Sequence, residues 1–306
     1  MKSVRGYLAD AITRVVWLVS AQTRADRNVE IALAALIQKE MSNVFDAVAY
    51  VDFLRRCVEP LWCSVVTLRS NGLLDNLHGL RFRTLLDCLQ ANLSPVPTAL
   101  ALEIARAADV LRGTRAPVES EHWAGDVGLH FGMCSSSRKG RLLFSIVRFC
   151  RPNVCVELGT GYGLSARFIL GMEPQELPLH LTTIEQHQPT YALVSPQLGD
   201  RYGSAVDCRL GSTTDVLPRL AKSLSPVHFV FHDAGHSLDD YTRDFSLIVD
   251  SIAPGGVLLI DDIRWQDARF HQGPANTYRG WQAIAGHKRI RYAVEIDRSI
   301  GLALLD

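Results

Sequence analysis

Residues 154–166 read VCVELGTGYGLSA. An apolar run leads to an acidic residue, and glycines follow at alternate positions, Gly159, Gly161 and Gly163. Glycine lets the backbone take positive φ and lets a ligand approach the chain closely. We therefore expect a strand that ends in a ligand-binding loop, whose ligand is an anion, a dinucleotide or an adenosyl group.

The spacing of these glycines disfavours two of the three ligand classes. A dinucleotide fingerprint needs G-x-G-x-x-G, and its last glycine would fall where Leu164 stands. A Walker-type phosphate loop needs G-K-[ST], which this segment lacks. Glu157 lies two residues before Gly159, and a carboxylate there favours a cationic or hydroxyl-bearing ligand over an anion.

Strand and helix patterns alternate through the second half of the chain, which predicts a parallel sheet with helices on both faces. The expected strands are residues 154–158, 180–184, 205–210, 227–231 and 257–260, with a helix over residues 238–252. Near the end, RYAVEID and IGLALLD are separated only by Arg298 and Ser299. A connection this short predicts an antiparallel C-terminal hairpin.

The N-terminal part of the chain has a different pattern. Residues 1–94 hold one of the 13 prolines and three of the 22 glycines, which is typical of a helical segment. An apolar face at helical spacing over residues 37–54 packs on neighbouring helices or forms a dimer seam. We expect a helical region over residues 1–124, acting as substrate lid or dimerisation region, and a catalytic domain over residues 125–306.

The overall composition limits the partners of the protein. Thirty-two basic and thirty-two acidic residues cancel, which disfavours nucleic acid or an anionic membrane surface. Seven cysteines without a C-x-x-C pair indicate reduced thiols. No apolar run approaches ~20 residues, and Asp10 and Arg14 interrupt the apolar N-terminus, so we expect a cytoplasmic protein without a signal peptide.

Glu185 follows the second expected strand, where an acid can accept hydrogen bonds from both ribose hydroxyls. A solvated surface glutamate is the alternative. Over residues 125–306 the sequence resembles the class I S-adenosylmethionine-dependent methyltransferases. The resemblance rests on Glu185 and on the segments VELGTGYG, SPVHFVFHDAGHS and LIVDSIAPGGVLLIDDI. The resemblance implies a doubly wound α/β fold whose seven-stranded sheet has the order 3-2-1-4-5-7-6.

The resemblance also implies roles for individual residues around S-adenosylmethionine. Glu157 would lie near the methionine amino group, and Glu185 would bind the ribose. The residues that would contact the rest of the cofactor are Gly159, Thr160, Gly161 and Gly163 beneath it, Gly211 and Ser212 near the adenine, and Asp233.

Three carboxylates should meet at the carboxyl edge of the sheet, because Asp233 and the pair Asp261 and Asp262 end neighbouring strands. Like charges this close need a compensating cation, and oxygen ligands suit Mg²⁺. The arrangement looks most like that of macrocin-type O-methyltransferases. Alternatively, Asp262 caps a turn and Asp233 contacts only cofactor or backbone.

A general base is needed to deprotonate an acceptor hydroxyl, and His236 is the candidate, together with Asp233. His236 capping the next helix is the alternative reading. Gly235 stands where macrocin-type enzymes often carry an acid, so the general base of those enzymes cannot be assigned directly to this sequence. His271 is a second candidate base, in the aromatic segment 264–284 that would form an acceptor pocket or a lid.

The sequence therefore predicts a small-molecule O-methyltransferase of secondary metabolism, either magnesium-assisted or metal-free. Two other functions remain open: N- or C-methyl transfer on the same fold, and a non-catalytic interaction module.

Overall fold

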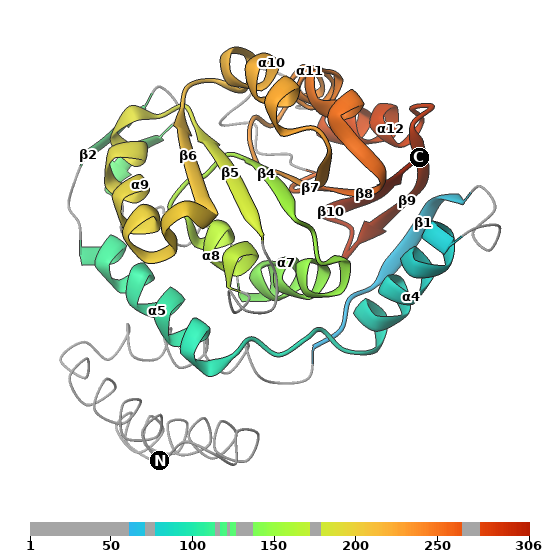
Figure 1. Ribbon diagram of the computed structural model, residues 1–306, viewed down its shortest axis with the longest axis horizontal. Helices are drawn as coiled ribbons and strands as arrows, with labels where there is room; N and C mark the ends of the chain where they lie inside the picture. Colours follow the sequence, from blue (N-terminus) through green and yellow to red (C-terminus); the bar gives the residue numbers. More distant parts are fainter. Residues whose placement is uncertain are drawn as a thin grey trace, which may run out of the picture.

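The computed structural model describes residues 61–70, 77–113, 117–120, 123–126, 137–171, 179–264 and 276–306 (Figure 1). The expected apolar face over residues 37–54 lies outside these ranges, as do His271, Trp265 and Phe270. In the described part of the chain, no helix is long and apolar enough to cross a membrane.

A single mixed sheet forms the centre of the molecule. Its eight strands are β1 (Val65–Ser70), β4 (Val154–Leu158), β5 (His180–Glu185), β6 (Val206–Leu210), β7 (Val227–His232), β8 (Ile252–Ile260), β9 (Ile290–Ile296) and β10 (Ile300–Leu305). They are ordered β1-β9-β10-β8-β7-β4-β5-β6. Strands β4 to β8 run parallel to one another, whereas β10 is antiparallel to β8 and β9, and β1 is antiparallel to β9.

The parallel sheet and the terminal antiparallel hairpin are confirmed. The hairpin connection is the three residues 297–299, one more than expected, and it places Asp297 and Arg298 at positive φ of 51° and 58°. The expected count of seven strands is wrong, and the strand order differs at the β9 edge. There β1, from a region expected to be helical, adds an eighth strand.

Helices cover both faces of the sheet, as Figure 1 shows. One face packs on α4 (Leu77–Ala91), α5 (Thr98–Gly113), α7 (Ser137–Cys150), α8 (Leu164–Leu170) and α9 (Gln188–Tyr202). The other packs on α10 (Thr213–Leu224), α11 (Leu238–Ile248) and α12 (Thr277–Ala285). A two-stranded sheet of β2 (Pro117–Ser120) and β3 (Trp123–Asp126) stands apart.

Period-two alternation in the strands produces these two cores. In β8, Val257 and Leu259 face the α7 side, whereas Leu258 and Ile260 face the α11 side. Helices α4 and α5 share the first core with α7 and α8, although they fall within the expected N-terminal region. The role of residues 1–124 as lid or dimerisation region stays a prediction.

Candidate functional site

Backbone hydrogen bonds join the ends of neighbouring strands and bring their following loops together. Gly159 N donates to Ile184 O at 3.0 Å, between the ends of β4 and β5. On the other side, Asp233 N donates to Leu158 O at 2.8 Å, and Asp261 N donates to His232 O at 2.9 Å. The loops after β4, β5, β7 and β8 therefore share one edge of the sheet, where open α/β folds bind ligands.

The glycine loop lies directly against the loop after β7. Gly159 has φ of +92°, and a Cβ added there would lie 2.3 Å from the Asp233 carbonyl oxygen. Gly161 has φ of +49°, but a Cβ there would meet no atom within 4 Å. Gly163 immediately precedes α8. There is therefore no room for a side chain at Gly159, which lies against the backbone of Asp233, whereas the space beside Gly161 is empty of protein atoms in the described ranges.

Glu157 lies beneath this loop and is fully buried. Its Oε2 accepts a hydrogen bond of 2.6 Å from Thr183 Oγ1, which also contacts Thr160 Oγ1 at 2.6 Å. Burial raises the pKa of Glu157 to about 8, and the nearby carboxylates of Asp233 and Glu185 add to the rise. Oε1 has no hydrogen-bond partner within the described ranges, so Glu157 fits a ligand that brings a donor, such as an ammonium group.

Glu185 holds the glycine loop from the end of β5. Its Oε2 accepts from Gly161 N and its Oε1 accepts from His187 N, both at 2.8 Å. The side chain is buried, and burial raises its pKa above the ordinary value. These contacts exclude the solvated surface glutamate, and a carboxylate with about four lone-pair sites keeps acceptor capacity for ligand hydroxyls.

Gly211 and Ser212 follow β6 beside Glu185. Gly211 N donates to Glu185 O at 2.9 Å, and Ser212 Oγ accepts from Asp215 N as the N-cap of α10. Ser212 therefore has a structural role at the helix start. Contacts of these two residues with an adenine stay a prediction.

Asp233, His236 and Asp262 form a cluster that has the ligand types of a metal site. One oxygen or nitrogen atom from each of the three lies within 4.8 Å of the others. His236 Nε2 is 3.4 Å from Asp262 Oδ2. All three residues are half-buried, so the cluster is open to a ligand from solution.

Asp261 lies outside this cluster, unlike its expected place among the metal ligands. Its carboxylate is buried and forms an ion pair with Lys139, which comes from the first turn of α7. The Lys139 ammonium is also 3.7 Å from Asp233 Oδ2. Asp261 and Asp262 both follow the last residue of β8, and Asp262 has a positive φ of 51°, so the two neighbouring carboxylates have different partners, Lys139 and His236.

Lys139 is the functional candidate that the sequence analysis missed. Only 17% of its side chain is exposed. Burial alone would raise the pKa of Asp262, but the hydrogen bond from His236 and the charge of Lys139 outweigh it and hold that pKa below its usual range. The segment SSSRKG carries no motif that separates this lysine from a surface residue.

The alternative reading of His236 as a helix cap is wrong. Ser237 is the N-cap of α11, with its side chain accepting from Asp240 N. At Gly235, where an acid was missing, a Cβ would lie 2.6 Å from Asp240 Cγ. The space beside the loop after β7 is thus already filled by a carboxylate from α11.

Comparison with known proteins gives one family and several relatives. Residues 156–263 match a family described as a methyltransferase domain. Catechol O-methyltransferase of Mus musculus is 30% identical over 149 residues, covering 47% of this chain and 51% of that protein. The enzyme of Sus scrofa is 32% identical over 133 residues, covering 41% of this chain and 68% of that protein. The chain spans about half the length of the first curated relatives it matches.

Solved structures share the fold at low sequence identity. The SAH-bound methyltransferase PaMTH1 of Podospora anserina aligns with a TM-score of 0.52 and 16% identity, over 66% of this chain and 87% of its own. An O-methyltransferase of Bacillus cereus in complex with SAH aligns with a TM-score of 0.50 and 16% identity, over 68% of this chain and 91% of its own.

Proposed function

The chain belongs to the S-adenosylmethionine-dependent O-methyltransferase family, and on this premise we propose that it methylates a hydroxyl of a small molecule. One observation carries the proposal: the buried, half-satisfied carboxylate of Glu157 and the Asp233–His236–Asp262 cluster occupy the same edge of the sheet. A cofactor cradle and a group able to activate an acceptor are therefore adjacent.

S-adenosylmethionine, when bound, supplies an activated methyl group on a positively charged sulfonium. Glu157 would hold its amino group through Oε1, and Glu185 would hold the ribose while it keeps Gly161 in place. Gly159 leaves room at the point where a side chain would collide with the backbone at Asp233. The acidic rim suits a cationic ligand.

Asp233 and Asp262 supply carboxylate oxygens that suit Mg²⁺. A divalent ion held there would lower the pKa of an acceptor hydroxyl. His236 would receive the hydroxyl proton, and the carboxylate of Asp262, whose Oδ2 is 3.4 Å from His236 Nε2, would stabilise the resulting imidazolium. Lys139 fixes Asp261 and limits the negative charge of the site.

Lys139 also supports a second candidate, metal-free transfer through His236. Its ammonium already compensates part of the charge of Asp233 and Asp261, so the site has a resident cation. The two candidates differ in whether cofactor turnover depends on a divalent ion.

For the acceptor, we propose catechols and hydroxylated secondary metabolites. The named relatives are catechol O-methyltransferases, which makes catechol the first compound to test. The sequence resemblance to macrocin-type enzymes adds hydroxylated natural products, although Asp261 does not join the expected arrangement of acids.

The test combines calorimetry with turnover. Purified, chelator-treated chain is titrated with S-adenosylhomocysteine and then with Mg²⁺ or Mn²⁺, and product formation from catechol is followed by mass spectrometry. Cofactor binding with metal-dependent turnover supports the proposal, and metal-independent turnover supports the second candidate. Absence of cofactor binding contradicts both and favours a non-catalytic module.

His236→Gln separates the two roles open to the imidazole. If His236 is the base, Gln at this position lowers turnover and leaves metal affinity unchanged. A metal ligand instead lowers metal affinity when it is removed.

A further inference from the structure

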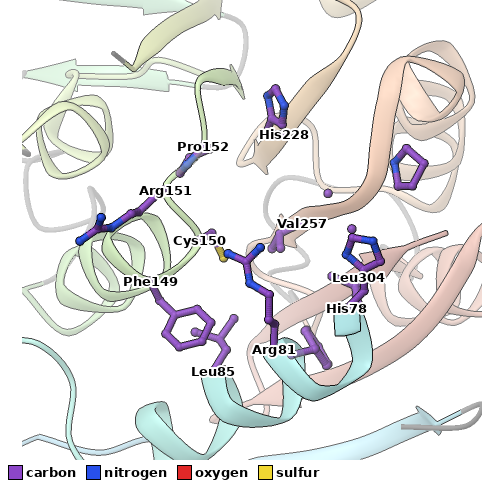
Figure 2. A pocket seen from close by; sticks show the side chains of 14 residues that line it. His78, Arg81, Leu85, Phe149, Cys150, Arg151, Pro152, His228, Val257 and Leu304 are labelled. Carbon is purple, nitrogen blue, oxygen red and sulfur yellow. The ribbon is translucent and has the colours of Figure 1, made fainter. Parts of the chain in front are cut away.

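A second cavity lies at the opposite edge of the sheet from the candidate site. It opens where β4, β7 and β8 begin, between the start of α4 and the end of α7 (Figure 2). Its volume is ≈ 150 Å³. At ~30 Å³ for each water molecule of the liquid, this space suits a small polar group.

The wall of this cavity is rich in nitrogen donors. Arg81 and His78 reach it from the first turns of α4, and His228 reaches it from β7. Figure 2 shows the Arg81 guanidinium beside Cys150 and Val257, whereas the side chain of Arg151 is directed away. No carboxylate side chain is among the described residues that line the cavity.

Arg81 is an exposed arginine at the rim of this cavity. Some arginines of the described ranges pair with carboxylates, as in the contacts of Arg201 with Glu103 at 2.7 Å and of Arg138 with Asp297 at 2.8 Å. Across the described ranges, Arg81 has neither an ion pair nor a hydrogen bond. Its charge is therefore available to an anion from solution.

Two histidines line the same cavity as Arg81 and are positioned by the backbone around them. His228 Nδ1 accepts from Val154 N at 3.3 Å, so a neutral ring carries its proton on Nε2 and can donate from there. His78 packs against Gly255, which has φ of +78° and where a Cβ would lie 2.3 Å from His78 Nδ1. Gly255 therefore lets this imidazole lie against the start of β8.

Cys150 lines the cavity, but its thiol is not reactive. Burial raises the pKa of Cys150 to about 12, and the opposing charge of Arg81 does not offset it. The thiolate needed for nucleophilic or metal chemistry is thus absent near neutral pH. The basic side chains carry the chemistry of this cavity.

We propose that this cavity is a binding site for a phosphate group, held by Arg81 with His78 and His228 as further donors. An arginine presents donors in a planar fork that matches phosphate oxygens, and hydrogen bonds to a charged acceptor are the strong ones. The apolar floor, which includes Phe82 and Val257, excludes water beneath the group. The site is separate from the loops after β4 and β8 and is independent of methyl transfer.

The test uses the full chain and inorganic phosphate. Calorimetric titrations are made in a non-anionic buffer at constant ionic strength, for the wild type, Arg81→Gln and Arg83→Gln. Arg83 lies on the same helix, paired with Asp87 on an exposed face, so its variant loses the same charge away from the cavity. A parallel titration with methyl phosphate tests whether the cavity binds free phosphate or the phosphate group of a phosphomonoester.

We expect saturable binding in the wild type and in Arg83→Gln, with affinity at least tenfold lower in Arg81→Gln. Saturating S-adenosylhomocysteine should leave phosphate affinity unchanged. Equal affinity in all three proteins, non-saturable heats, or competition with S-adenosylhomocysteine would overturn the proposal. If Arg81→Gln fails to fold, the exposed His78→Gln replaces it and should weaken binding several-fold.

Discussion

Replacing Glu157 with glutamine should remove a pH dependence of stability that the wild type carries. The carboxyl group is buried, and its pKa is raised from 4.5 to about 8. Between these values the folded chain keeps a proton that the unfolded chain releases. The free energy of unfolding therefore falls as pH rises through this window, and the loss is complete above about pH 8.

The size of the effect follows from the gap between the two pKa values. Each pH unit of difference corresponds to ~1.4 kcal/mol, so the gap from 4.5 to about 8 is worth up to ~5 kcal/mol. Glutamine keeps an acceptor for Thr183 and has no charge to bury. Glu157→Gln should therefore gain on the order of 4 kcal/mol over the wild type between about pH 5 and pH 8.5.

Urea denaturation at both pH values measures this difference. Glu103→Gln is the control, because Glu103 lies on α5 in contact with Arg201 and should leave the pH dependence of the wild type intact. Saturating S-adenosylhomocysteine should reduce the wild-type pH dependence, since an ammonium beside Oε1 favours the charged carboxylate. Parallel curves for wild type and Glu157→Gln would refute the reasoning.

Three further predictions concern the loop and the acids. Gly159→Ala should lower the free energy of unfolding by more than ~2 kcal/mol and abolish S-adenosylhomocysteine binding. Gly161→Ala has open space around its Cβ and should lower that free energy by only ~1 kcal/mol. Chemical denaturation measures both values. Lys139→Gln should destabilise the chain by ~3–5 kcal/mol by leaving Asp261 buried and unpaired, and adding Asp261→Asn should restore most of this loss in a double-mutant cycle. Asp262→Asn should weaken Mn²⁺ binding by about tenfold or more in calorimetry, and unchanged affinity would remove Asp262 from the metal site.

Much of the sheet could be predicted because its strands are apolar runs bounded by turn residues. Residues 154–158 form β4 as expected, and β5, β6 and β7 differ from expectation by one residue each. Strand β8 begins at Ile252, five residues before the expected start. Pro254, Gly255 and Gly256 have the composition of a loop, and they fall within an irregularity of the pairing with β7, between the pairs Val227–Ile252 and Phe229–Val257. The strand continues through this bulge, which strand composition does not predict.

The site could be predicted only in part, because adjacency in the sequence is not adjacency in space. Asp261 and Asp262 look equivalent in IDDI, yet the chain leaves the strand after Ile260 and takes a positive φ at Asp262, so that one pairs with Lys139 and the other with His236. The partner of Asp261 is 122 residues earlier in the chain, on a helix whose orientation depends on the assembled core. No local pattern reports such a pairing.

The edge strand β1 imposes an order on biosynthesis. Its partner β9 lies near the C-terminus, and Ser64 N donates to Asp297 Oδ1 at 2.8 Å across a separation of 233 residues. A nascent chain emerges N-terminus first, so β1 leaves the ribosome long before β9 exists. The parallel strands can pair while synthesis continues, whereas the β10-β9-β1 side of the sheet closes only after residues 290–305 have been synthesised. Until then β1 is an unpaired strand edge, available to chaperones or to another nascent chain.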